Sequence, residues 1–60
     1  MTKKEMIADV LIALQNPGKL LVKKMESVPF AESREKSLSG LSKTQLEEIL
    51  AVISFENAWN

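Results

Sequence analysis

Three residue types that often carry catalysis or bind metals are absent from this 60-residue chain, which has no cysteine, no histidine and no tyrosine. Without cysteine no disulfide can form, and without cysteine and histidine a zinc site loses its usual ligands. Acid–base and nucleophilic catalysis need a group whose pKa can be brought near neutrality, with a partner that orients it. We therefore expect a protein that is not an enzyme and that holds no metal and no cofactor.

Long apolar runs are absent as well. The longest uninterrupted run covers residues 10–14, whereas a membrane-spanning helix needs about 20 apolar residues. The apolar region of a signal peptide is also longer than this run. We expect a soluble, cytoplasmic protein that makes no contact with membranes.

The length of the chain allows one domain at most, and a domain of this size buries only about 60% of the surface that its unfolded form exposes. Small folds commonly supplement such a thin core with disulfides, a structural metal or oligomerisation. The composition excludes the first two. We expect residues 1–60 to form a single helical domain that is completed by homodimerisation.

The same helix-start pattern occurs twice in the sequence. A hydroxyl residue stands three positions before Glu or Gln, as Thr2 before Glu5 and as Ser42 before Gln45. The hydroxyl can accept a hydrogen bond from the third helical amide, and the longer side chain can accept one from the amide of the cap. Helices are therefore predicted to begin at residues 3 and 43. Each start is flanked by a pair at the spacing of a hydrophobic staple: Met1 with Met6, and Leu41 with Leu46.

Apolar residues recur at three- and four-residue spacing after the first start, which predicts an amphipathic helix over about residues 3–15. Ile12 does not belong to this stripe and projects on nearly the opposite side of the helix. A helical segment that is apolar almost all round is usually covered on more than one side. A second subunit is the simplest cover for Ile12 in a chain this short.

Two prolines separate the middle of the chain into further helices. Pro17 disfavours helical geometry in the residue before it and suits the first turn of a new helix, so we predict a helix over about residues 17–27 with Asn16 as its cap. Pro29 ends this helix. A short helix over about residues 30–37, or a loop in its place, follows before the serine- and glycine-rich connection.

The last helix is predicted over about residues 43–55, with an apolar stripe that begins at Leu46. Phe55 and Trp59 stand four residues apart and extend that stripe if the helix continues. They either fold over the core or serve as exposed anchors for a partner, because aromatic residues are enriched at binding hot spots. The expected fold is all-α, a small bundle of three or four short helices in which the first and last pack their stripes together.

Charge is unevenly distributed, although the formal net charge is zero. Residues 1–25 carry five lysines against two acids, for a net charge of +3, and residues 26–60 carry six glutamates against three bases, for −3. This asymmetry favours an antiparallel homodimer in which the lysine-rich part of one subunit lies beside the glutamate-rich part of the other. The residues predicted to take part in self-association are Ile12, Val22 and Val52.

Nucleic-acid binding is the alternative function, because the N-terminal half is basic. A helix-turn-helix centred on Gly18 does not fit, since Lys24 and Leu14 occupy the positions that need an apolar and a small residue. The same half contains no arginine and no aromatic residue for base recognition. The candidate nucleic-acid contacts are Lys3, Lys4, Lys19, Lys23 and Lys24.

Carboxylates are the remaining candidates for catalysis. Glu5 with Asp9, and Glu32 with Glu35, stand at helical spacing. Paired carboxylates act in hydrolytic sites only within a cleft that raises the pKa of one of them, and acidic side chains are mostly solvent-exposed. We interpret both pairs as surface residues. The same interpretation applies to the acidic residues of the last helix: Glu47, Glu48 and Glu56.

These patterns together favour a regulatory or interaction protein that acts by binding another protein. In size and in its lack of catalytic residue types, the chain is similar to the small accessory proteins that phages and mobile elements encode. The predicted partners are a second copy of the chain and another protein, with nucleic acid as the alternative.

Overall fold

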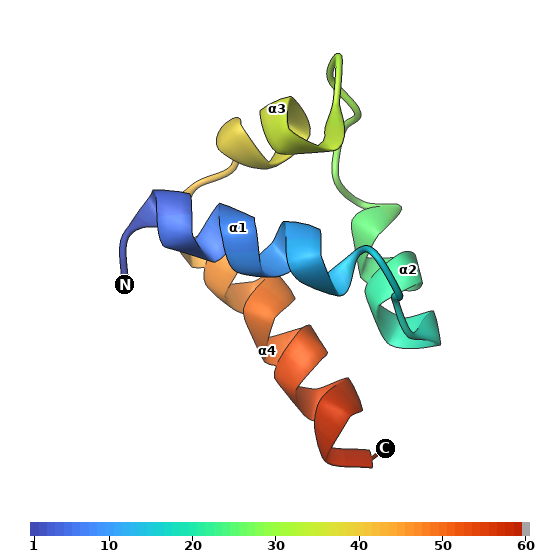
Figure 1. The fold of residues 1–60 in the computed structure, drawn as a ribbon. Coiled ribbons are helices and arrows are strands. Elements are labelled where there is room, and N and C mark those ends of the chain that lie inside the picture. The colour runs from blue at the N-terminus through green and yellow to red at the C-terminus, as the bar shows by residue number, and fades with distance from the viewer. Residues whose placement is uncertain (60) are drawn as a thin grey trace.

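The structure, a computed structural model, describes residues 1–59 and contains four helices within them (Figure 1). They are α1 (Lys3–Ala13), α2 (Lys19–Met25), α3 (Arg34–Ser39) and α4 (Lys43–Trp59). No strand occurs among these residues, so the predicted all-α fold is confirmed. The Cα radius of gyration is 10.6 Å, close to the roughly 10.4 Å of a compact chain of this length.

The longest helix, α4, organises the fold. α1 crosses over its N-terminal half and α2 packs along its other side, while α3 packs on α1 (Figure 1). This is the predicted arrangement, in which the first and last helices pack together and the second closes one side. The core lies where the helices meet and contains these buried residues: Met6, Val10, Leu14, Leu21, Leu38, Leu41, Leu46 and Ile49.

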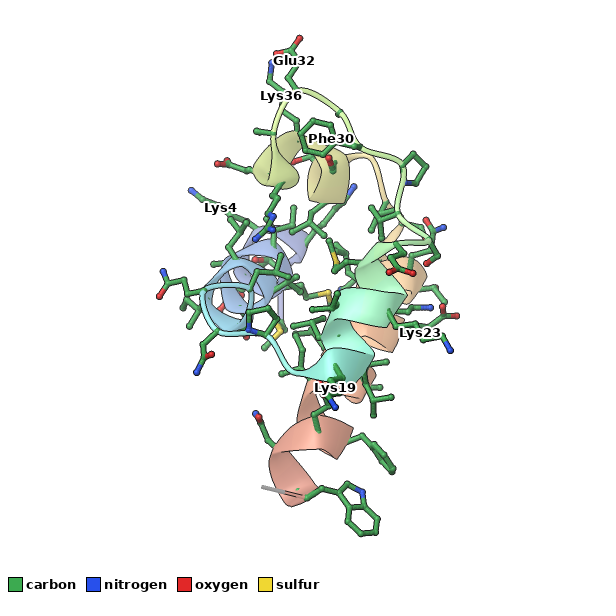
Figure 2. All side chains as sticks on the ribbon, turned by 90° about the vertical axis from the view of Figure 1, so that its right-hand side faces the viewer. Lys4, Lys19, Lys23, Phe30, Glu32 and Lys36 are labelled. Carbon is green, nitrogen blue, oxygen red and sulfur yellow. The ribbon has the colours of Figure 1, made fainter. Side chains whose placement is uncertain are left out.

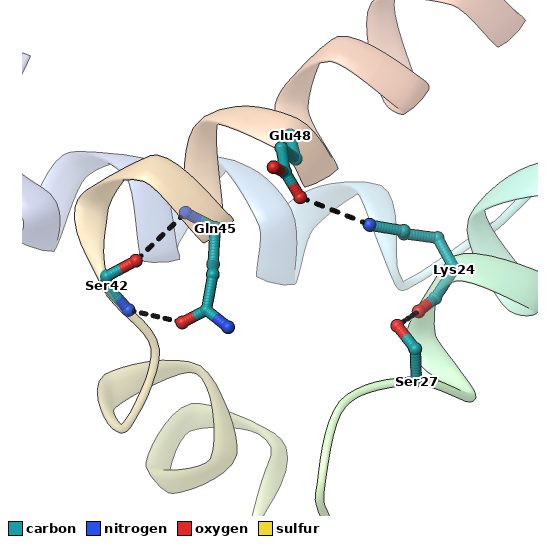
Figure 3. Close-up of polar contacts among 5 residues, drawn as sticks. All are labelled: Lys24, Ser27, Ser42, Gln45 and Glu48. Carbon is teal, nitrogen blue, oxygen red and sulfur yellow. Dashed lines mark hydrogen bonds and ion pairs between the residues drawn. The ribbon is translucent and has the colours of Figure 1, made fainter.

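Both predicted capping boxes are present. At α1, the Thr2 hydroxyl accepts from the Glu5 amide at 3.2 Å, and the Glu5 carboxylate accepts from the Thr2 amide at 2.8 Å. At α4, Ser42 and Gln45 exchange the same two hydrogen bonds at 3.2 and 2.8 Å (Figure 3). The sequence pattern therefore located both helix starts.

The two hydrophobic staples differ. Leu41 and Leu46 are both buried in the core. Met6 is buried, but Met1 is 67% exposed. Only the staple at α4 has both members in the core, because the otherwise exposed connection between α3 and α4 places Leu41 against the core.

The predicted start of α2 is wrong. α2 begins at Lys19, and its cap is Gly18, which has no side chain to bind the first amides. Asn16 lies in the bend that follows α1 instead. The local capping preference of asparagine is overridden because the carboxylate of Glu56, from α4, binds the first amides of α2.

α3 lies later in the sequence than the predicted helix over residues 30–37. Its cap is Ser33, whose hydroxyl accepts from the Lys36 amide at 3.2 Å. Leu38, near its other end, is completely buried. A local cap at one end and a core residue at the other determine where this six-residue helix forms.

Candidate functional site

The residues predicted to take part in self-association lie in three separate grooves. Ile12 is 64% exposed and lines a groove between α1 and the C-terminal half of α4. Val22 lines a second groove between α2 and the segment that includes Phe30. Val52 lines a third, between α2 and α4. The structure therefore does not bring Ile12, Val22 and Val52 onto one surface.

Apolar atoms form most of the surface of the third groove, which we call the α2–α4 groove. Its volume is about 550 Å³. The lining residues are Leu20, Lys23, Lys24, Ser27, Ala51, Val52 and Phe55. Leu20 and Phe55 are large apolar side chains that remain 45% and 55% exposed at its edges.

One ion pair joins the α2 side of this groove to α4, and one hydrogen bond closes the end of α2 itself. Lys24 Nζ lies 3.4 Å from Glu48 Oε2, and the Ser27 hydroxyl donates to the Lys24 carbonyl at 2.7 Å (Figure 3). The Lys24–Glu48 pair is partly exposed and contributes little stability by itself. It does direct the end of the Lys24 side chain toward α4.

Phe55 and Trp59 form an aromatic pair beside the α2–α4 groove. Their ring centroids are 5.9 Å apart with the planes tilted by 55°, within the range of a favourable aromatic contact. Trp59 is 77% exposed. The last turns of α4 extend beyond the other helices (Figures 1 and 2). Phe55 and Trp59 therefore do not fold over the core, and they offer an apolar surface to solvent.

Glu56 connects α4 to the start of α2, and sequence reasoning missed it. Its carboxylate oxygens accept from the Leu20 amide at 3.0 Å and from the Leu21 amide at 2.9 Å. A Cβ atom at position 18 would lie 2.6 Å from Glu56 Cδ, so glycine leaves the room that the carboxylate occupies. The prediction that Glu56 is a surface acid is wrong, because the side chain is partly buried. The one local signal was a helix start with no capping side chain at Gly18.

The candidate nucleic-acid lysines form two groups and no common surface. Lys3 and Lys4 begin α1, whereas the other three belong to α2. Lys4 and Lys23 lie on opposite sides of the molecule in Figure 2. Two of the five already have partners, since Lys3 Nζ donates to the Ser39 carbonyl at 2.9 Å and Lys24 pairs with Glu48.

The two carboxylate pairs are not assembled into a catalytic site. All four side chains are exposed. Glu5 caps α1, and its pKa is lowered chiefly by the hydrogen bond from the Thr2 backbone amide and then by the Thr2 hydroxyl, opposite to the change that a general acid needs. Glu32 forms an ion pair with Lys36 instead of with a second carboxylate.

Across 1–59, no group of three or more residues with metal-binding side chains is found. No helix in that part of the chain is both long enough and apolar enough to cross a membrane.

Comparisons with protein-family models, with curated proteins and with solved structures found no match. The candidate site is therefore defined by geometry: the α2–α4 groove and the aromatic pair beside it.

Proposed function

We propose that this protein is not an enzyme and acts by binding protein through the α2–α4 surface, which we define as Leu20, Val52, Phe55 and Trp59. The observation that carries the proposal is the exposure of Phe55 and Trp59 next to an apolar groove. Isolated exposed apolar residues are common, but large ones gathered around a groove are typical of interaction sites. Aromatic residues are also enriched among those that dominate binding energy.

The construction of this surface supports the proposal. Its apolar centre is bordered by the charged residues Lys23 and Lys24, the arrangement of an apolar core and a polar rim that protein interfaces have. Glu56, the residue after Phe55, ties the start of α2 to α4. A surface that is held in place before binding loses less entropy when a partner arrives.

Site-specific photo-crosslinking tests the proposal. A photoreactive phenylalanine analogue in place of Phe55 is expected to capture discrete protein partners in the cells that express the chain. The matched control is the same analogue at Thr44, an exposed residue of α4. Thr44 precedes Phe55 by eleven residues, about three helical turns, and so lies on the same side of α4. Equal capture at both positions, or none at Phe55, would contradict the proposal.

Nucleic-acid binding is the competing function, and the observation that favours it is the cluster of three lysines in seven-residue α2. Titration with duplex DNA separates the two. Phosphate contacts would produce affinity that falls steeply as salt is added, and Lys19→Gln and Lys23→Gln would weaken it. No DNA binding at low salt would exclude this alternative.

A further inference from the structure

The outer side of α4 carries a self-complementary row of residues. Ala51, Phe55 and Trp59 stand four apart, so they follow one another along the same face of the helix. The row has a small residue at one end, a large one at the other and Phe55 in the middle. All three are exposed. A row of this kind fits a reversed copy of itself, because the large end then meets the small end.

Twofold symmetry requires such a match. In a twofold (isologous) contact, every contact occurs twice: if a first residue of one copy touches a second residue of the other, the second residue of the one copy also touches the first residue of the other. With the axis beside Phe55, two antiparallel α4 helices place each Trp59 against Ala51 of the other copy. The α2–α4 groove, about 550 Å³, lies at Ala51 and Val52, where this arrangement needs space for an indole ring.

The shape of the molecule leaves α4 accessible to another α4. Its C-terminal turns extend away from α1 and α3, toward the end of the molecule where α2 begins (Figures 1 and 2). A second helix can therefore approach this end from outside. The first two turns of α4 remain beside α1 and α3, where the core is already closed.

Charge agrees with an antiparallel arrangement. The row on α4 is preceded by Glu47 and Glu48, whereas the start of α2, next to Glu56 near the other end of α4, carries Lys19. Glu48 already pairs with Lys24 of its own chain, so Glu47 is the glutamate that a reversed copy brings to the end of the other copy that carries Lys19. The chain has no net charge, so two copies do not repel each other as a whole.

We propose that the α2–α4 surface binds a second copy of this chain, as a twofold dimer in which the α4 helices run antiparallel and cross at Phe55. This inference rests on the proposed function and identifies its first partner. Trp59 of each copy packs on Ala51 of the other. Of the three residues predicted for self-association, Val52 lies in this interface, whereas Ile12 and Val22 lie outside it.

Disulfide crosslinking tests the register of the dimer, since the chain contains no native cysteine. Ala51→Cys and Trp59→Cys are prepared separately, mixed and oxidised. The mixture is expected to form mostly the mixed dimer, because these positions face each other across the axis. Phe55→Cys is expected to crosslink with itself. Thr44→Cys is the matched control, because at its level along α4 the antiparallel copy has already ended, and it should not crosslink.

Sedimentation gives an independent measurement without cysteine. The unmodified protein is expected to be a dimer whose dissociation constant Ala51→Trp raises by about 10- to 100-fold, because the added ring fills the space for Trp59. Ala51 is exposed, so the monomer tolerates the change, which circular dichroism checks. Ile12→Ser and Val22→Ser are the matched controls and should leave the dimer intact.

Three results would overturn the inference. They are a folded monomer at the highest soluble concentration, crosslinking of Thr44→Cys equal to that of Phe55→Cys, or a dimer that Ile12→Ser disrupts and Ala51→Trp does not. If the protein is monomeric while the analogue at Phe55 still captures another protein, the proposed function stands and the dimer does not. A monomer that instead binds anionic vesicles through Phe55 would overturn both.

Discussion

The first amides of α4 and those of α2 obtain their hydrogen-bond acceptors in different ways. Every helix begins with amides that have no partner inside the helix. At α4, the acceptors come from within a four-residue stretch: the Ser42 hydroxyl accepts from the Gln45 amide, and the Gln45 side chain accepts from the Ser42 amide. At α2, Gly18 provides no side chain, and Glu56, 36 residues from Leu20, supplies both acceptors. One start is specified by its neighbours, and the other exists only after the chain has folded.

This difference has an energetic consequence. The cap of α4 stabilises its helix as soon as the first turn forms. α2 has only seven residues, too few for a helix that persists alone in water. Its stability must come from packing on α4 and from the Glu56 carboxylate. α2 and the C-terminal half of α4 are therefore expected to fold and unfold together.

The largest expected effect comes from removing a core side chain in the first turn of α4, the helix whose cap is local. Leu46 is completely buried, and Leu46→Ala is expected to reduce the free energy of unfolding by about 2–5 kcal/mol. That range approaches the whole stability of a chain this short, roughly 3–9 kcal/mol. Urea denaturation followed by circular dichroism measures the loss. Thr44→Ala, at an exposed position of the same helix, should change little, and a loss below about 1 kcal/mol for Leu46→Ala would contradict the assigned core.

The next largest effect is expected at the start of α2, where Gly18→Ala should change stability in opposite directions with and without Glu56. Gly18→Ala is expected to displace the Glu56 carboxylate and to destabilise the protein by up to about 2 kcal/mol, the value of a lost helix cap. In a Glu56→Ala background there is no carboxylate to displace. The backbone at Gly18, with φ −80° and ψ 174°, suits alanine, so the same substitution should then stabilise by about 0.4–1 kcal/mol.

Gly40→Ala is the matched control for this cycle. A Cβ atom there would meet its nearest neighbour, the Ser37 carbonyl oxygen, at 3.7 Å, an ordinary contact. It should therefore be neutral or stabilising in both backgrounds. If Gly18→Ala changes the free energy of unfolding in the same direction with and without Glu56, then Glu56 does not couple α4 to the start of α2 as described.

Amide hydrogen exchange measures how far each cap acts along the chain. Ser42→Ala is expected to cost about 1 kcal/mol and to accelerate exchange at Gln45 and its neighbours in α4. Glu56→Ala should instead accelerate exchange at Leu20 and Leu21, far away in sequence. If both variants accelerate exchange uniformly, the two starts do not differ in the way described.

The smallest expected effect distinguishes the two capping boxes by pH. The α1 box contains Glu5, whose pKa is lowered from 4.5 by the Thr2 amide and hydroxyl, whereas the α4 box contains Gln45, which does not titrate. The stabilisation from Glu5 is present above the unfolded pKa and is lost as the pH falls through the lower folded pKa. NMR titration should show first-turn amides of α1 responding over that range, and Glu5→Gln should abolish the response. A midpoint for Glu5 at or above 4.5 would contradict this.

Local chemistry could be predicted from the sequence because its signals lie within a few residues. The Thr2 and Ser42 caps and the outward position of Ile12 follow from spacing alone. The start of α2 could not be predicted in the same way. Asn16 has the better capping side chain, and only the packed structure shows that Glu56 reaches the amides that Asn16 does not.

The candidate site was predictable to a similar extent. Residue type alone singled out Phe55 and Trp59, and spacing placed them on α4. The groove beside them depends on α2 lying along α4, which brings Leu20 next to Val52. The same packing separates Val52 from Val22 and Ile12. Which exposed apolar residues share a surface is decided by how the helices cross, and that information is not local.

The carboxylate of Glu56 also sets an order of events during protein synthesis. The amides of Leu20 and Leu21 leave the ribosome well before their acceptor does, since Glu56 follows them by 36 and 35 positions. At roughly 5–20 residues per second, the delay is about 2 to 7 s. During that time the first amides of α2 lack their acceptor, and a chain that stops before residue 56 never acquires it. The last turns of α4 thus close the fold in time as well as in space.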